Sequence, residues 1–76
     1  MSEELRERLR AIVAEVAELD EVPDGEPFSD LGIDSMIAIE IIADVEREYK
    51  IKVPEDELKQ IVDLNSVVAL VQARLG

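Results

Sequence analysis

Cysteine, histidine and tryptophan are absent from this chain of 76 residues, and its aromatic side chains are limited to one phenylalanine and one tyrosine. Without cysteine, the chain has no disulfide, no thiolate nucleophile and no thiolate metal ligand. Without histidine, it lacks the usual general base and the commonest metal ligand. Because a chain of this length is also too short to enclose a deep catalytic cleft, we expect a protein that is not an enzyme.

Positive charge is scarce as well, with eight basic against nineteen acidic residues and a net charge of −11. Such a field repels nucleic acid and anionic membranes and attracts proteins with basic patches. No apolar run is long enough to span a bilayer, and residues 1–4 lack the basic and apolar regions of a signal peptide. We therefore expect a soluble, monomeric, cytoplasmic protein that binds no nucleic acid and does not insert into membranes.

The carboxylates do not form a convincing metal site. The stretch Asp20-x-Val22-x-Asp24-Gly25 resembles the start of a calcium loop, but Val22 stands at its third position and Leu31 at its twelfth, where a glutamate is needed. Asp34, Glu40, Asp44 and Glu48 are spread around a helix without a histidine. We expect no bound metal, and we interpret the acids as a solvated face or a docking surface.

Apolar residues recur with helical spacing in several segments, and 47% of the residues are hydrophobic, so the chain can bury enough surface to fold. We expect a first helix over about residues 2–19 with its apolar positions at Leu5, Leu9, Ile12, Val13, Val16 and Leu19. Residues 20–33 carry two prolines and two glycines, which predicts a long loop anchored by Val22, Phe28, Leu31 and Ile33.

Beyond the loop, the pattern predicts a second helix over about residues 35–49, with an apolar stripe at Met36, Ile39, Ile42, Val45 and Tyr49, widened by Ile37 and Ile41. A short third helix should begin after Pro54 and run to about Val62, and a last helix should cover about residues 66–75 and end at Gly76. This order predicts an all-α fold, a small antiparallel four-helix bundle of three longer helices and one short one, in a single domain over residues 1–76.

Ser35 lies at the start of the second helix, directly after Asp34. In this position either side chain can cap the helix by accepting from the unpaired N–H groups of its first turn. A phosphoryl group esterified to Ser35 would also be favoured here by the helix dipole and those N–H groups. The two residues by themselves leave both interpretations open.

The longer stretch Phe28-Ser29-Asp30-Leu31-Gly32-Ile33-Asp34-Ser35-Met36, followed by Ile39-Glu40-Ile41, resembles the attachment motif of acyl carrier proteins. The order of helices, the long first loop, the acidic composition and the connector Lys52-Val53-Pro54-Glu55 resemble that family too, so the resemblance covers nearly the whole chain. It implies that Ser35 carries 4′-phosphopantetheine, joined through a phosphodiester by a phosphopantetheinyl transferase that uses coenzyme A. The thiol of this group would then hold acyl intermediates as thioesters and replace the missing cysteine.

The resemblance also implies roles for residues near Ser35. Asp34 would cap the helix and mark the site for the transferase. The second helix would be the recognition helix, and its acids would meet basic docking patches on acyl-loading and acyl-processing enzymes: Glu40, Asp44, Glu46 and Glu48. Three apolar residues would either contact those partners or line an interior cleft that shelters the acyl chain: Met36, Ile37 and Ile39.

Two departures from the family pattern bear on the pathway. Many fatty-acid carriers have an acidic residue two places after the modified serine, where this chain has Ile37, so we expect a specialised partner. Lys50 and Lys52 also interrupt the negative charge at the far end of the helix. Peptidyl carriers usually lack an aspartate before the serine, which makes that class less favoured than a fatty-acid, polyketide or related acyl pathway.

Two other functions are compatible with the residues alone. The chain could be an acidic helical adaptor that binds a basic protein, with Ser35 only a helix cap. Ser35 could instead be a phosphorylation switch, for which its place at a helix terminus is the only support.

Overall fold

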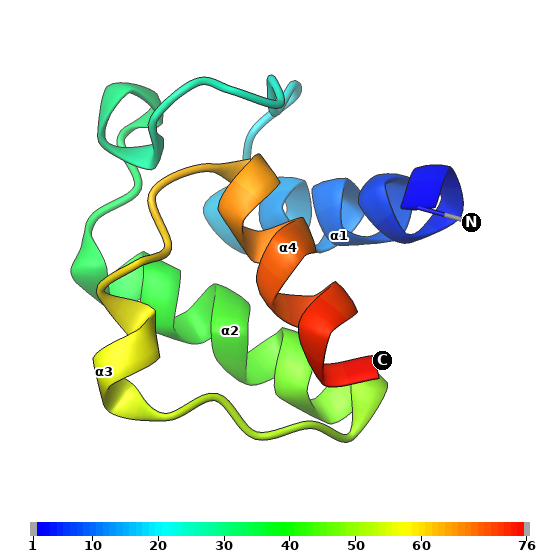
Figure 1. The fold of residues 1–76 in the computed structure, drawn as a ribbon. Helices are drawn as coiled ribbons and strands as arrows, with labels where there is room; N and C mark the ends of the chain where they lie inside the picture. The colour runs from blue at the N-terminus through cyan, green and yellow to red at the C-terminus, as the bar shows by residue number, and fades with distance from the viewer. Residues whose placement is uncertain (1, 76) are drawn as a thin grey trace.

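The computed structural model describes residues 2–75, and within that range all regular structure is helical. Four α-helices follow one another along the chain: α1 (Ser2–Ala17), α2 (Ser35–Tyr49), α3 (Glu55–Leu58) and α4 (Leu64–Leu75). A short 3₁₀ helix, η1 (Phe28–Leu31), lies in the long loop between α1 and α2. Figure 1 shows α1 and α2 running in opposite directions, with α4 packed on α1. The predicted all-α bundle of three longer helices and one short helix is confirmed.

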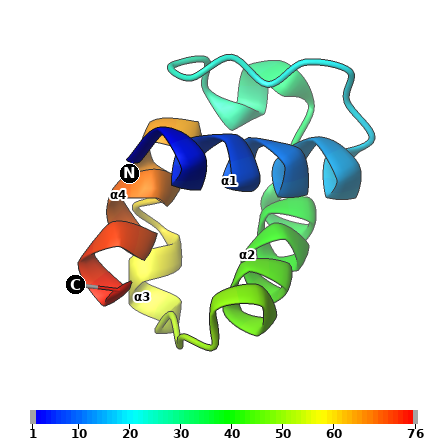
Figure 2. The ribbon, with the colours of Figure 1, turned by 90° about the vertical axis from the view of Figure 1, so that its right-hand side faces the viewer.

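The core forms where α1, α2 and α4 meet. Helix α1 contacts both other long helices, and it lies across them with the long loop on its far side (Figure 2). The fully buried side chains recur every three or four residues on these three helices. The largest of them are Leu9, Val13, Ile41, Val45, Leu64, Val67 and Val71. Burial of these side chains supplies most of the driving force for folding.

The second helix has the predicted bounds, but its apolar stripe is buried only in part. Val45 and Ile42 are buried as expected, and Ile41 is buried completely. Met36 and Ile39, at the start of the predicted stripe, are instead 72% and 54% exposed. The first turns of α2 therefore project beyond the region that α1 and α4 cover.

Three helix boundaries differ from the prediction. Helix α1 ends at Ala17, because Glu18 adopts a left-handed conformation (φ 58°) and the N–H of Leu19 donates back to the carbonyl of Ala14 over 2.9 Å. Helix α3 is a single turn that ends at Leu58, after which residues 59–61 continue in tighter turns. Helix α4 starts at Leu64, two residues before the predicted start, and the expected end at Gly76 lies outside the described residues.

A reciprocal cap explains the early start of α4. The backbone N–H of Ser66 donates to Oδ1 of Asp63 (2.9 Å), and the backbone N–H of Asp63 donates to Oγ of Ser66 (3.0 Å). This is the arrangement of a capping box, which satisfies donors at the helix terminus on both sides. Asp63 is therefore the capping residue, and Ser66 lies inside the first turn.

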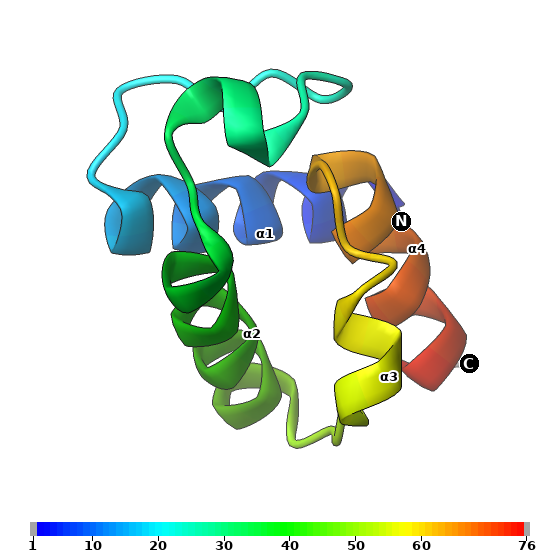
Figure 3. The same cartoon turned by 90° about the vertical axis from the view of Figure 1, so that its left-hand side faces the viewer.

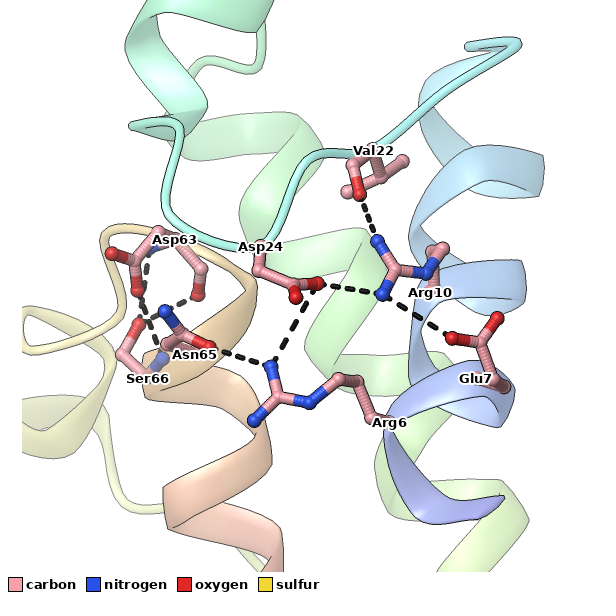
Figure 4. A network of polar contacts seen from close by, with 8 residues as sticks. All are labelled: Arg6, Glu7, Arg10, Val22, Asp24, Asp63, Asn65 and Ser66. Carbon is pink, nitrogen blue, oxygen red and sulfur yellow. Dashed lines mark hydrogen bonds and ion pairs between the residues drawn. The ribbon is translucent and has the colours of Figure 1, made fainter. Parts of the chain in front are cut away.

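The long loop is held on the bundle by polar contacts from two helices (Figure 4). The guanidinium of Arg10 on α1 donates to the carbonyl oxygen of Val22 and to Oδ1 of Asp24, the latter over 2.6 Å. Arg6, one turn earlier, bridges Asp24 and the side chain of Asn65 on α4. The side chains of Val22 and Phe28 are buried, as predicted for anchors of this loop, together with Ile33, whereas Leu31 is half-buried.

Two backbone hydrogen bonds add to these contacts. The N–H of Phe28 donates to the carbonyl of Val62 (2.7 Å), and the N–H of Asn65 donates to the carbonyl of Asp24 (3.2 Å). Both connect the loop to the segment around the start of α4. Figure 3 shows η1 at the same end of the molecule as the start of α4, with α2 and α3 below it. No helix within residues 2–75 combines the length and the apolar character needed to cross a membrane.

Candidate functional site

Ser35 is the first residue of α2, and its position is set by the residues just before it. Gly32 adopts a left-handed conformation (φ 79°), which ends η1 and turns the chain toward α2. Ile33 follows with a buried side chain, and its N–H donates to the carbonyl of Phe28 (3.0 Å). The chain is thus anchored in the core two residues before Ser35, while Ser35 itself is exposed.

Asp34, and not Ser35, caps the helix. Its Oδ1 accepts from the backbone N–H of Ile37 over 2.9 Å, and its backbone is extended as capping residues require. Within residues 2–75, the hydroxyl of Ser35 takes part in no side-chain hydrogen bond. The hydroxyl is therefore available for modification at a helix N-terminus, where peptide dipoles favour a phosphodiester.

An apolar cleft of about 710 Å³ opens beside Ser35. One wall comes from the first turns of α2 and includes Ile39 and Ile42. Phe28 and Ile33 reach it from the loop, and Leu58 belongs to the opposite wall, which α3 and the following residues form. Figure 3 shows these three parts of the chain around the same region. Ser35 and Asp34 lie on the margin of the cleft, so a group attached to Ser35 has direct access to it.

The three predicted apolar partner residues occupy different environments. Met36 projects into solvent, and Ile39 is exposed but also lines the cleft. Ile37 is half-buried and packs against the core. Only Met36 and Ile39 therefore combine proximity to Ser35 with an exposed apolar surface.

The four predicted docking acids of α2 are also unlike one another. Asp44 pairs with Arg47, Glu48 pairs with Arg8 across the bundle, and Glu46 accepts from the backbone N–H of Val53 over 2.7 Å. In the described part of the chain no ion pair or hydrogen bond involves the side chain of Glu40, which is exposed. Glu40 is thus the member of this set whose carboxylate is available without breaking an internal contact.

Sequence reasoning missed the α3 side of the cleft. Leu58, Lys59, Ile61 and Val62 all line it. The signal in the sequence was the apolar spacing of 58, 61 and 62, which fits one side of a helical segment. Only a short helix to about Val62 was predicted in this segment, and it was assigned no part in a site.

Comparisons with known proteins find relatives among acyl carrier proteins. A family model described as "Phosphopantetheine attachment site" matches residues 7–72. The polyketide-8 synthase acyl carrier protein 2 of Streptomyces avermitilis is 40% identical over 74 residues, which cover 93% of this chain and 85% of that protein. The anthracycline acyl carrier protein DauA of a Streptomyces species is 40% identical over 77 residues, which cover 95% of this chain and 87% of the relative.

Some relatives are far longer. The 3-methylorcinaldehyde synthase of Sarocladium schorii is 34% identical over 71 residues, which cover 91% of this chain but only 3% of the synthase. A solved acyl carrier protein from Thermotoga maritima has a TM-score of 0.84 at 22% identity, covering 97% of this chain and 89% of the other, and so supports the fold.

These matches do not favour an acidic adaptor in which Ser35 only caps a helix. The family model spans most of the chain, and the carriers of similar length align with it nearly from end to end. An exposed serine hydroxyl on the first turn of α2, next to a capping aspartate, suits attachment of a phosphopantetheine group. The chain therefore belongs to the acyl carrier protein family, whose members hold acyl groups on covalently attached 4′-phosphopantetheine.

Proposed function

We propose that Ser35 is the attachment residue. The observation that carries this proposal is the division of roles at the start of α2: Asp34 supplies the cap, and the exposed hydroxyl of Ser35 is not used by the fold. In the attachment reaction, Oγ of Ser35 bonds to the phosphorus that bears the pantetheine of coenzyme A. The bond from that phosphorus to the adenosine 3′,5′-bisphosphate breaks, and the hydroxyl proton is lost to a base on the transferase.

The intact mass of the protein tests this assignment. The parent should gain one phosphopantetheinyl group on incubation with coenzyme A, Mg²⁺ and a broad-specificity phosphopantetheinyl transferase, and Ser35→Ala should gain none. Ser29→Ala is the matched control, because Ser29 is another exposed serine that lines the same cleft. Loading of Ser35→Ala, or failure to load a folded parent, would contradict the proposal.

We propose a second role for Asp34, in recognition by the transferase. Asn caps a helix about as well as Asp, so Asp34→Asn should keep the melting temperature of the parent while it removes the charge next to Ser35. We expect slower loading of this variant at an unchanged melting temperature. An unchanged loading rate would restrict Asp34 to its capping role.

We propose that the protein is a freestanding, monomeric carrier in the cytoplasm, a single domain over residues 1–76 that is not itself an enzyme. Support comes from carriers of similar length, of which the alignments cover 85–87%. These relatives are named as polyketide synthase and anthracycline acyl carrier proteins, and we propose a polyketide pathway for this chain as well. The isoleucine at position 37 supports a pathway other than standard fatty-acid synthesis.

We propose that partner enzymes use basic patches to bind α2, with Met36, Ile39 and Glu40 as the main contacts. Their exposure near Ser35 supports this choice. Glu40→Gln should weaken binding of a loading enzyme, and the loss should shrink at high salt. Glu15→Gln on α1, also an exposed acid, is the control for the change in net charge. Equal weakening by both variants would show that only net charge matters.

We propose that the cleft beside Ser35 receives the acyl chain. Its apolar lining and its margin at Ser35 support this assignment. An acyl chain in the cleft would be removed from water, and this transfer of apolar surface lowers the free energy.

A further inference from the structure

The cleft is apolar except at a few side chains, and only one of these is basic. The polar residues in its lining are Ser29, Asp34, Ser35, Glu55 and Lys59. Lys59 follows the last residue of α3 and is therefore on the wall opposite the start of α2. Lys59 thus places a positive charge at an apolar cleft in a chain whose net charge is −11.

Lys59 is not part of the ion-pair system of the fold. Every ion pair within residues 2–75 uses an arginine: Arg6, Arg8, Arg10, Arg47 or Arg74. Glu55, four residues before Lys59 on the same wall, makes no ion pair with it within 4.0 Å. A lysine beside an apolar wall lays its methylene stem along that wall and holds its ammonium at the water boundary. The ammonium of Lys59 is thus available to a molecule that enters the cleft.

The remaining lining offers few hydrogen-bond donors. A carboxylate such as that of Asp34 or Glu55 only accepts hydrogen bonds, and Ser35 loses its hydroxyl proton when it is esterified. This leaves the hydroxyl of Ser29 and the ammonium of Lys59 as side-chain donors. A fully saturated acyl chain needs no donor, but each carbonyl oxygen that enters an apolar cleft gives up hydrogen bonds to water at a free-energy cost.

We propose that Lys59 determines the specificity of the cleft, by donating a hydrogen bond to a carbonyl oxygen of a 3-oxoacyl chain held on Ser35. This inference rests on the proposed function, in which Ser35 bears the acyl group and the cleft receives it. A hydrogen bond to a charged group is worth more than one between neutral groups. Lys59 therefore compensates the desolvation of an oxygenated chain and gives a saturated chain no advantage.

The test compares two cargoes in four proteins. The apo forms of the parent, Lys59→Met, Lys59→Arg and Lys52→Met are loaded by a broad-specificity transferase with octanoyl or 3-oxooctanoyl coenzyme A analogues whose thioester is replaced by an amide. Intact mass establishes loading, and the melting temperature of each loaded form is compared with that of its own unacylated holo form. Lys52→Met is the matched control, because Lys52 is an exposed lysine that does not line the cleft.

We expect the 3-oxooctanoyl chain to raise the melting temperature of the parent, and Lys59→Met to lower that gain by about 4 °C while the gain from octanoyl stays the same. Lys59→Arg should keep the 3-oxo gain, and Lys52→Met should behave as the parent. In the parent, amide NMR signals of residues 58–62 should also differ between the two cargoes, and this difference should vanish in Lys59→Met.

The other outcomes separate the two proposals. In Lys59→Met, the melting temperature could instead fall by the same amount in both loaded forms and in the holo form. That result would assign Lys59 to the phosphodiester and overturn the inference. An unchanged 3-oxo gain in Lys59→Met, or no gain from either cargo in the parent, would also overturn it while Ser35 stays the attachment site. A folded parent that accepts no arm would overturn both the proposed function and the inference.

Discussion

The contact between Arg10 and the long loop gives a prediction whose size can be worked out from the structure. Arg10→Met keeps an apolar stem of similar length but removes the donors to the carbonyl of Val22 and to Asp24. The matched variant is Arg47→Met. It removes the same charge and breaks one ion pair, between Arg47 and Asp44, which lies within α2 and holds no loop.

The expected free energies differ because the two arginines differ in environment. A hydrogen bond from a charged group to a backbone carbonyl contributes about 1.5–3 kcal/mol. The pair with Asp24 adds about 0.2–1 kcal/mol, since its side chains are 27% and 48% exposed. Because both side chains are partly exposed to water, we take a value near the lower end of the sum and expect Arg10→Met to lower the free energy of unfolding by about 2 kcal/mol. For Arg47, which is 75% exposed, the pair is worth about 0.3–0.5 kcal/mol.

Thermal and urea unfolding followed by circular dichroism measure both variants. A difference of about 1.5 kcal/mol corresponds to a melting temperature about 6–12 °C lower for Arg10→Met than for Arg47→Met in a domain of this size. Because both variants carry the same net charge, repulsion among the carboxylates affects them alike. Equal melting temperatures would refute the argument that Arg10 stabilises the fold by holding the loop.

Four further predictions follow from other parts of the structure. Asp63→Ala should lower the free energy of unfolding by about 1 kcal/mol through loss of the α4 cap, whereas Asp63→Asn should stay close to the parent in urea unfolding. Ile41→Ala should cost about 2–5 kcal/mol because the side chain is completely buried, and Ile39→Ala should change stability by less than about 0.5 kcal/mol because that side chain is largely exposed. Added salt should raise the melting temperature by screening the net charge of −11, and a melting temperature indifferent to salt would contradict this account. Burial raises the pKa of Tyr49 above its ordinary 10.0, against the opposing effect of Arg8. The stability that the neutral phenol contributes should therefore be complete below pH 10 and fall as the pH rises through the folded-state pKa. A phenol absorbance titration of folded and urea-unfolded protein checks the direction of the shift.

The sequence was most informative where its signals are local. The bounds of α2 were predicted correctly, because Asp34 supplies a cap and the apolar spacing continues without interruption to Tyr49. Phe28 and Ile33 could be identified as loop anchors, since large apolar residues between prolines and glycines gain from burial. For Ser35 the local signal was not enough, because a helix cap and a modification site fit its position equally well. Its proposed role as the attachment residue came from the resemblance of the surrounding motif to a known family.

The boundary between α3 and α4 was not predictable from spacing alone. The predicted third helix ran to about Val62, and Ile61 and Val62 follow Leu58 at a spacing that fits a helix. In the structure the segment turns toward the loop, where the carbonyl of Val62 accepts from the N–H of Phe28. That partner lies more than thirty positions away in the sequence, and no local pattern encodes it.

The α3 wall of the cleft and the internal contacts of the acidic side chains on α2 were missed for a related reason. Glu48 has the same residue type and helical setting as Glu40, yet it pairs with Arg8, forty residues before it. Lys59 joins the site only because α3 packs across from α2. Spacing along one helix can identify a face, but it does not show which other part of the chain covers that face.

The two hydrogen bonds that join the long loop to the start of α4 run from backbone to backbone, at Phe28 to Val62 and at Asn65 to Asp24. Such bonds do not depend on which side chains the loop carries. Exposed positions such as Glu26, Ser29 and Asp30 can therefore be exchanged without loss of these two connections. The loop is consequently a segment in which new partner preferences can be engineered, or can arise by mutation, while Phe28 keeps its place in the lining of the cleft.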